Sequence, residues 1–218
     1  MIVTIDGPAG SGKTSAARGL AARLGFEVLD TGAMYRAVAV AALRGGVAVD
    51  DPATLAALLS RIRIEMPPGH VRLNDEDVSL VIRTPEVSQA ASKVASVRVV
   101  REFLVGLQRM IADGRDMVTE GRDQGTVVFP EADCKFFLQA DREERARRRL
   151  AEIHDRGSRH VTFEEVLAQQ EERDRRDASR DLAPMVAADD AKIIDTSNMT
   201  PDEVLDQLER EVRRCLPV

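Results

Sequence analysis

The chain lacks the residue patterns of structural metal sites and of disulfide-rich scaffolds. Its 218 residues include two cysteines, Cys134 and Cys215, which are far apart in the sequence and have no metal-type spacing. The three histidines, His70, His154 and His160, form no ligand pattern on one face. We therefore expect a cytoplasmic protein with reduced cysteines and no structural metal.

Long apolar runs are also missing. No run approaches the roughly 20 residues needed to cross a bilayer. Met1 leads directly into a predicted strand, without the pattern of a signal sequence. We expect a protein without a membrane partner. No repeat or low-complexity linker is found, and 218 residues suit one α/β core with excursions.

The chain has no net positive charge and very few lysines. The formal net charge is -6, which argues against general nucleic-acid binding, because that requires a net basic surface. Only four of the 31 basic residues are lysines. Nearly every cation is therefore an arginine, the better group for bidentate contacts with phosphate. Any binding of phosphate must rest on local clusters of these side chains.

Residues 7–14 provide the strongest motif, because they read Gly-Pro-Ala-Gly-Ser-Gly-Lys-Thr, a complete P-loop pattern. The motif follows an apolar run at 2–5 and precedes a helix-like stretch at 15–24, which is the context that its mechanism requires. Glycines let consecutive N–H groups point at phosphate oxygens. Lys13 would reach the β and γ phosphates, and the hydroxyl of Thr14 would face Mg²⁺, directly or through a water. The predicted ATP-binding residues are Gly7, Pro8, Ala9, Gly10, Ser11, Gly12, Lys13, Thr14 and Ser15.

The rest of the chain alternates strand and helix signals, which indicates an α/β fold. Gly25 is a predicted helix cap, Asp30-Thr31 precedes a helix at 34–43, and the apolar spacing over 87–111 has a break near Ser96. A small β excursion is predicted between about 61 and 83. Other predicted elements are strands at 26–29, 116–119, 134–139 and 192–195, a helix at 52–59, and a last helix after residue 200.

Residues 141–181 differ from the rest, because Arg and Asp/Glu dominate and apolar positions become sparse. A long charged face is usually only solvated. A mobile cover over an anionic ligand has the same composition, and we favour this interpretation in a protein with a P-loop. We call residues 142–181 the charged segment.

A P-loop alone does not separate GTPases, motor or transport ATPases, and small-molecule kinases. The chain has neither the Asn-Lys-x-Asp and Asp-x-x-Gly patterns of switch GTPases nor a Leu-Ser-Gly-Gly-Gln-like signature of ABC-type ATPases. A kinase remains the best class. An acceptor phosphate is already a nucleophile, so such an enzyme needs no dedicated catalytic base.

Several blocks, in order and at family-like spacing, give the chain a more specific resemblance. They are residues 7–13, 29–36, 120–130, 135–138 and 188–197, and the Gly-Arg-Asp-x-Gly-Thr-Val-Val-Phe-Pro block at 121–130 is highly specific. From end to end the chain resembles the bacterial cytidylate kinases. This resemblance implies transfer of a phosphoryl group from MgATP to CMP or dCMP, with these small molecules as partners. We expect a monomer, because no coiled coil or long exposed apolar helix demands a protein partner.

The resemblance also implies the fold and its parts. The expected fold is a three-layer P-loop kinase fold with a central parallel sheet, helices on both faces, a small β-containing acceptor-binding insertion and a helical lid. The single kinase domain would comprise a core at about 1–31, 112–141 and 182–218. The nucleoside monophosphate-binding region would span about 32–111, and the lid about 142–181.

Family resemblance assigns roles to individual residues. The expected catalytic residues are Lys13, Arg122, Arg148 and Arg180. The expected CMP-binding residues are Thr31, Arg36, Ser92, Arg101, Arg122, Asp123, Arg173, Asp177 and Arg180. Among these, Arg36, Arg122 and Arg180 would hold the acceptor phosphate. Ser92, Arg101 and Asp123 would read the cytosine ring and its surroundings. Residues 173 and 177 would lie near the acceptor sugar.

Two of these assigned arginines have alternative residues close by in the sequence. Asp113-Gly114-Arg115-Asp116 repeats the Gly-Arg-Asp triplet, but only the second copy is followed by Gly-Thr-Val-Val-Phe-Pro, so we assign function to Arg122. Arg148 lies in a run of three arginines, in which Arg147 or Arg149 are alternatives for the contact with the donor phosphates.

Other functions remain open at this stage. The enzyme alternative is another small P-loop kinase that acts on uridylate, shikimate or a similar acceptor. The non-enzyme alternative is a nucleotide-binding module that has lost phosphate transfer.

Overall fold

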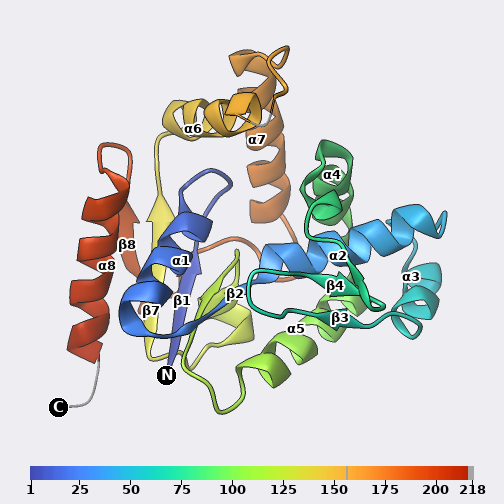
Figure 1. The fold of residues 1–218 in the computed structure, drawn as a ribbon, viewed down its shortest axis with the longest axis horizontal. Coiled ribbons are helices and arrows are strands. Elements are labelled where there is room, and N and C mark those ends of the chain that lie inside the picture. Colours follow the sequence, from blue (N-terminus) through green and yellow to red (C-terminus); the bar gives the residue numbers. More distant parts are fainter. Residues whose placement is uncertain (156, 216–218) are drawn as a thin grey trace. The chain divides into compact units, whose positions relative to one another are not determined.

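The computed structural model describes residues 1–155 and 157–215, which divide into two compact units. One unit comprises Met1–Phe26 and Asp116–Val218, and the other is Glu27–Arg115. Figure 1 gives the element labels used below. Each unit is described separately.

The first unit contains a parallel sheet in which β1 (Ile2–Asp6) lies between β6 (Met117–Glu120) and β7 (Cys134–Gln139). β8 (Lys192–Asp195) extends this sheet beyond β7, again in parallel. The β-branched residues of β1 suit a strand that is covered on both faces, and its Val3 and Ile5 side chains are completely buried. The predicted α/β fold with a central parallel sheet is confirmed.

Helix α1 (Lys13–Leu24) begins at the P-loop lysine and is capped by Gly25 in the left-handed conformation, as the sequence predicts. Helix α8 (Pro201–Cys215) packs against α1, as Figure 1 shows. A Cβ atom on Gly19 would come within 2.7 Å of the Leu205 side chain, so glycine permits this close approach. α8 buries an apolar stripe of Val204, Leu208 and Val212, each of which stabilises the fold by about 1.5–3 kcal/mol.

Two helices form most of the charged segment: α6 (Arg142–Asp155) and α7 (Phe163–Ala178), which pack against each other. α7 begins with a complete capping box, in which Thr162 and Glu165 each bond to the backbone of the other. Before this segment, a short π-helix, η2, covers Gln124–Val128. The amide groups of Val127 and Val128 both donate to the carbonyl oxygen of Asp123, at 2.9 and 3.1 Å.

The second unit begins with β2 (Glu27–Asp30) and helix α2 (Thr31–Arg44). The Asp30 carboxylate caps α2 by accepting from the amide of Ala33 at 2.8 Å, which confirms the predicted cap. Helix α3 (Pro52–Leu59) follows. The predicted helical region at 87–111 is two helices, α4 (Pro85–Val94) and α5 (Arg98–Ala112), so the break near Ser96 is also confirmed.

The predicted β excursion is a three-stranded antiparallel sheet in this unit. It consists of β3 (Ile64–Glu65), β4 (Arg72–Leu73) and β5 (Glu76–Asp77). Asn74 and Asp75, both with positive φ, form the turn between β4 and β5. A short 3₁₀-helix, η1 (Val81–Arg83), leads from this sheet to α4.

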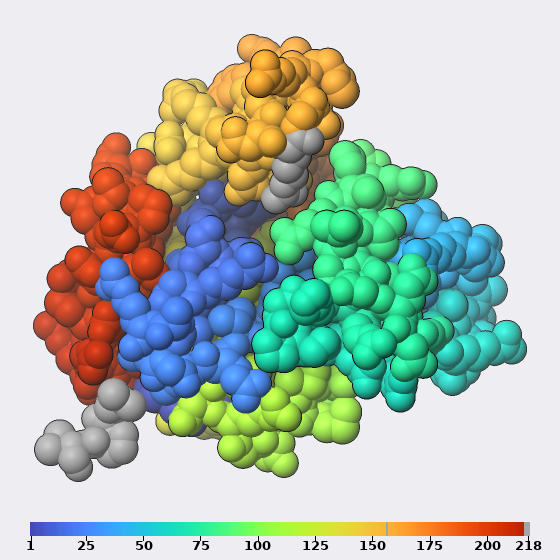
Figure 2. All heavy atoms as spheres, in the orientation of Figure 1, coloured from blue at the N-terminus to red at the C-terminus, as the bar shows by residue number. Residues whose placement is uncertain are grey.

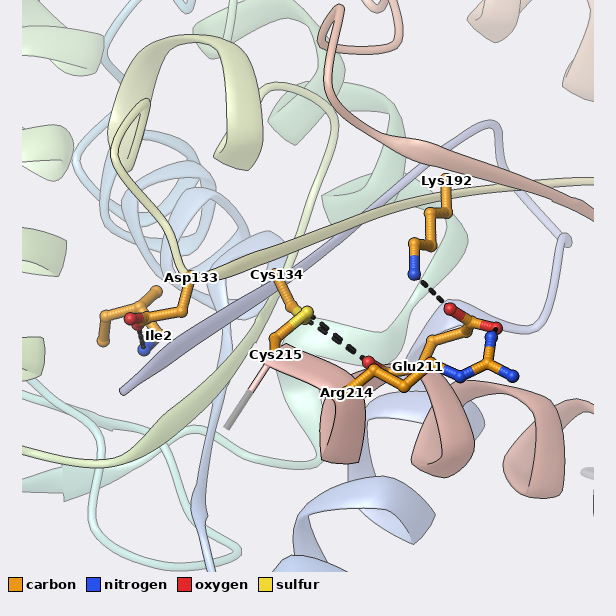
Figure 3. Close-up of a disulfide and its surroundings, with 7 residues drawn as sticks. All are labelled: Ile2, Asp133, Cys134, Lys192, Glu211, Arg214 and Cys215. Carbon is orange, nitrogen blue, oxygen red and sulfur yellow. Dashed lines mark hydrogen bonds and ion pairs between the residues drawn. A yellow bond between two sulfur atoms is a disulfide. The ribbon is translucent and has the colours of Figure 1, made fainter. Parts of the chain in front are cut away.

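The expectation of two reduced cysteines is wrong for this structure. Cys134 and Cys215 form a disulfide with a Cα–Cα distance of 6.5 Å, and no cysteine is free. Figure 3 shows it joining the start of β7 to the end of α8, with both sulfurs facing the carbonyl oxygen of Glu211. β8 lies parallel to β7, and α8 then runs back along the sheet. The chain therefore returns to the start of β7 after 81 positions.

Candidate active site

The P-loop connects the carboxyl end of β1 to α1. Its glycines Gly7, Gly10 and Gly12 have φ of 139°, 78° and 87°, in the region that favours glycine. A Cβ atom on Gly7 would lie 2.0 Å from the carbonyl oxygen of Leu138, so no other residue fits there without a shift of the backbone. The sequence-predicted motif therefore has the local geometry that its glycines require.

Lys13 lies buried at the start of α1, and its ammonium donates to the carbonyl oxygen of Pro8 at 2.5 Å and to Ser11 Oγ at 3.3 Å. Burial, followed by the nearby cations Arg122 and Arg173, lowers the pKa of Lys13 to about 7. An anionic group placed among these cations would favour the charged ammonium. The electrostatics of the P-loop therefore suit a phosphate.

Thr14 lies next to an acidic residue that sequence reasoning left without a role. Its hydroxyl donates to Glu120 Oε1 at 2.8 Å, and Glu120 is a buried residue at the carboxyl end of β6. Oxygen ligands of this kind are those that Mg²⁺ prefers, usually together with waters and substrate phosphates. Among residues 1–155 and 157–215, no group of three His, Cys, Asp or Glu residues could hold a metal alone. The pair fits a cation bound mainly by nucleotide phosphates.

Asp6 is a second residue that the sequence reasoning missed. Its carboxylate accepts from the amides of Gln124 at 2.9 Å and Gly125 at 2.8 Å, so it ties the end of β1 to η2. Burial, with a smaller effect of the Asp123 carboxylate, raises the pKa of Asp6 to about 6. The available signal was an acidic residue directly after a buried apolar run.

Asp177, on α7, brings together three of the arginines predicted to bind substrate. Its carboxylate is 3.0 Å from Arg122 Nε, 3.9 Å from Arg173 Nε and 3.7 Å from a terminal nitrogen of Arg180. Burial alone would raise its pKa, but the three cations together hold the pKa of Asp177 below its usual range. The structure therefore gathers predicted residues from the 121–130 block and from the charged segment.

The three arginines in the run on α6 have different partners. The Arg148 guanidinium donates to the Oγ1 atom of Thr196 at 3.1 Å and to the carbonyl oxygen of Thr196 at 2.7 Å, and it also binds Glu144. Thr196 Oγ1 also lies 3.1 Å from the carbonyl oxygen of Gln139 and 3.4 Å from that of Ser11 in the P-loop, so its hydroxyl donates to one or the other. The neighbouring arginines form ion pairs along α6, Arg147 with Glu143 and Glu144, and Arg149 with Glu152.

The duplicated triplet is also resolved by position. Arg115 forms an ion pair with Glu27 at 3.0 Å, in which both side chains are about half exposed. Arg122 is largely buried, and although burial opposes the charge, Asp177 and Glu120 raise its pKa above the usual value. Only the second copy of the triplet has the environment of a buried cation site.

The second unit contains the remaining predicted acceptor residues. Arg36 lies 3.2 Å from the Asp30 carboxylate, and Arg101 is buried with its guanidinium 5.9 Å from the centre of the Tyr35 ring. Ser92 is buried on α4, and its Oγ has no hydrogen-bond partner among the described residues. Thr31 is a buried residue in the first turn of α2, whereas Asp123 is buried in the first unit.

Comparisons with known proteins agree on one family. The cytidylate kinase family model matches residues 3–214. The cytidylate kinase of Rhodopirellula baltica is 47% identical over 216 residues, which are 99% of this chain and 94% of the relative. That of Geobacter sulfurreducens is 46% identical over 217 residues, 98% and 93% of the two chains.

Among solved structures, the shikimate kinase of Bacteroides thetaiotaomicron has a TM-score of 0.51 at 11% identity and covers 98% of each chain, which shows the shared kinase fold. No helix of the described residues is long and apolar enough to span a membrane. The chain belongs to the cytidylate kinase family, whose members use ATP to phosphorylate CMP and dCMP.

Proposed function

We propose that the chain transfers the γ-phosphoryl group of MgATP to the phosphate of CMP or dCMP, and that the residues predicted from the sequence carry out this transfer. The observation that carries the proposal is the group of cations in the first unit. Arg122, Arg173 and Arg180 lie 3.0, 3.9 and 3.7 Å from the Asp177 carboxylate, and burial, together with Arg122 and Arg173, lowers the pKa of Lys13. Phosphoryl transfer consists mainly of positioning and of neutralising charge on oxygens, which such a group supplies.

The donor half of the proposal uses the P-loop. Residues 7–15 would bind the phosphates of ATP through the Lys13 ammonium and through their backbone amides, except those of Pro8, which has no N–H, and Ala9, which donates to Asp174. Thr14 and Glu120 would hold Mg²⁺, which neutralises charge on the β and γ oxygens when bound. Arg148, placed by Thr196 beside the P-loop backbone, would approach the donor phosphates from α6.

The acceptor half of the proposal uses the residues that the family resemblance assigns to CMP. Arg36, Arg122 and Arg180 would bind the CMP phosphate, because guanidinium forks match phosphate geometry. Ser92, Arg101 and Asp123 would read the cytosine, whose exocyclic amine can donate to a carboxylate. Arg173 and Asp177 would contact the sugar. Asp177 would then exchange contacts with arginine for contacts with ribose hydroxyls.

The charged segment would close over the reacting phosphates and exclude water, which could otherwise take the phosphoryl group. Comparison of crystals with no ligand and with both nucleotides tests this role. Movement of part of this segment supports it, and an unchanged segment contradicts it. We further propose that the protein acts as a monomer in the cytoplasm.

The experiment that tests the proposed function is identification of the product. Incubation of the chain with CMP and ATP labelled on the γ phosphorus should give labelled CDP. Absence of CDP while ATP still binds would favour the nucleotide-binding module instead. Initial rates with CMP, dCMP, UMP, AMP and shikimate distinguish this kinase from the other small P-loop kinases.

A further inference from the structure

Two residues of the charged segment, Arg145 on α6 and Asp174 on α7, contact the P-loop at Ala9. Asp174 Oδ1 accepts from the Ala9 amide at 3.2 Å, and a terminal nitrogen of Arg145 donates to the Ala9 carbonyl oxygen at 2.9 Å. The two side chains also form an ion pair with each other. Both polar backbone groups of Ala9 are therefore bound by one ion pair.

This contact is enclosed by further bonds within the first unit. Arg145 is buried and donates through Nε to the carbonyl oxygen of Ala140 at 3.1 Å. Gln170 Nε2 donates to the carbonyl oxygen of Arg145 at 3.4 Å. A Cβ atom at Gly10 would lie 2.8 Å from Gln170 Nε2, so the P-loop approaches both helices closely. In Figure 2 the yellow and orange atoms of the charged segment lie directly above dark blue atoms of the N-terminal segment.

We propose that Asp174 and Arg145 are positioning residues for the ATP site, because they hold the Ala9 peptide and so fix the P-loop in the shape that receives phosphates. The N–H and C=O of Ala9 are already bound by this ion pair and are not available to ATP. The ion pair therefore acts on ATP binding by placing the neighbouring backbone amides of the P-loop. A glycine-rich loop loses much conformational freedom when a ligand orders it. Ordering the loop beforehand lowers that cost of binding.

Arg142 and Glu171 provide a matched control. Their ion pair at 3.2 Å also joins α6 to α7, and Glu171 lies one helical turn from Asp174 on the same helix. Both side chains are largely exposed. No described contact of this pair involves the P-loop. The Glu171→Ala variant therefore removes a link between the two helices and leaves Ala9 bound.

The experiment compares Asp174→Ala, Asp174→Asn and Glu171→Ala with the unmodified chain, by titration with ATP and by steady-state kinetics. Asp174→Ala should weaken ATP binding and raise KM for ATP about tenfold, the size of one hydrogen bond to a charged group. The kcat and the KM for CMP should stay within about twofold. Asp174→Asn retains an acceptor for the Ala9 amide and should give a smaller change, and Glu171→Ala should give none.

Equal KM values for ATP in Asp174→Ala and Glu171→Ala would overturn the proposal, as would a loss confined to kcat. If circular dichroism shows that Asp174→Ala is unfolded, the isosteric Asp174→Asn is compared with Glu171→Ala instead: its neutral side chain is a weaker acceptor, so a KM for ATP above that of Glu171→Ala supports the proposal and an equal KM overturns it. The inference rests on the proposed ATP site. Failure of the unmodified chain to bind ATP would reject that function, whereas normal ATP binding by both Asp174 variants would reject only the positioning role.

Discussion

The side chains of Arg122 and Asp177 form a 3.0 Å ion pair that joins the Gly-Arg-Asp block after β6 to helix α7 of the charged segment. Both side chains are largely buried, at 17% and 6% exposure, so the pair is shielded from water. Removal of one partner from such a pair leaves an uncompensated charge. This relationship links the most family-specific block of the sequence to its most charged region.

Arg122→Ala should lower kcat/KM for CMP by about 10²–10³-fold, because it removes a cation proposed to face the transferring phosphoryl group. Arg115→Ala is the matched control, since this arginine occupies the same place in the first copy of the triplet and only pairs with exposed Glu27. Steady-state kinetics at saturating ATP measure both. Activity of Arg122→Ala close to that of the unmodified chain would show that the second triplet has been assigned wrongly.

Arg148→Ala should reduce kcat at least about tenfold, because this side chain is placed against Thr196 next to the P-loop. Arg147→Ala and Arg149→Ala should stay within about twofold, since their ion pairs are with glutamates of α6 itself. The same kinetic assay compares the three variants. A larger loss in Arg149→Ala than in Arg148→Ala would shift the donor contact by one residue.

ATP affinity should fall as pH rises above about 7, the pKa of Lys13 in the free protein. Below that pH the ammonium is charged with or without ATP, and binding is strongest. Above it, binding must first return a proton to Lys13, because phosphates raise its pKa, and the affinity falls by at most about tenfold per pH unit. Isothermal titrations at pH 8.5, in two buffers of different ionisation enthalpy, should detect uptake of a proton. Lys13→Arg stays charged and should show none, whereas uptake that is equal in both proteins would contradict the assignment.

The disulfide should stabilise the fold by about 4 kcal/mol, because closure of an 81-residue separation restricts the unfolded chain. Urea unfolding with and without a reducing agent measures the difference. The Cys134→Ser, Cys215→Ser double variant should be insensitive to the reductant. Thiol titration of protein purified without reductant provides a separate check: two free thiols would agree with the reduced protein expected from the sequence, and none would agree with the structure.

Local signals in the sequence were sufficient for much of the fold. Gly25 and Asp30 cap helices where the sequence places them, because their effect depends on neighbouring backbone groups alone. The break between α4 and α5 was likewise visible in the apolar spacing. The P-loop combined a strand, a turn and a helix start within one short motif.

Contacts between distant segments could not be derived in the same way. The disulfide, the bonds of Asp6 to η2 and the contact of Asp174 with Ala9 each depend on how strands and helices stack in space. The π-helix η2 was also missed, because Thr126-Val127-Val128 has the β-branched composition of a strand. Two amides sharing the Asp123 carbonyl oxygen stabilise the helical turn instead.

The most direct test of the account is the ratio of kcat/KM for CMP to kcat/KM for UMP, with MgATP as donor. Cytosine and uracil differ at the exocyclic group that a buried carboxylate such as Asp123 can read, and a site with unpaired polar groups rejects the wrong base. We predict turnover of CMP and dCMP, with a ratio of CMP over UMP of at least ~10 and still lower activity with AMP. Equal or faster turnover of UMP or AMP would contradict the assignment of this site to cytidine nucleotides.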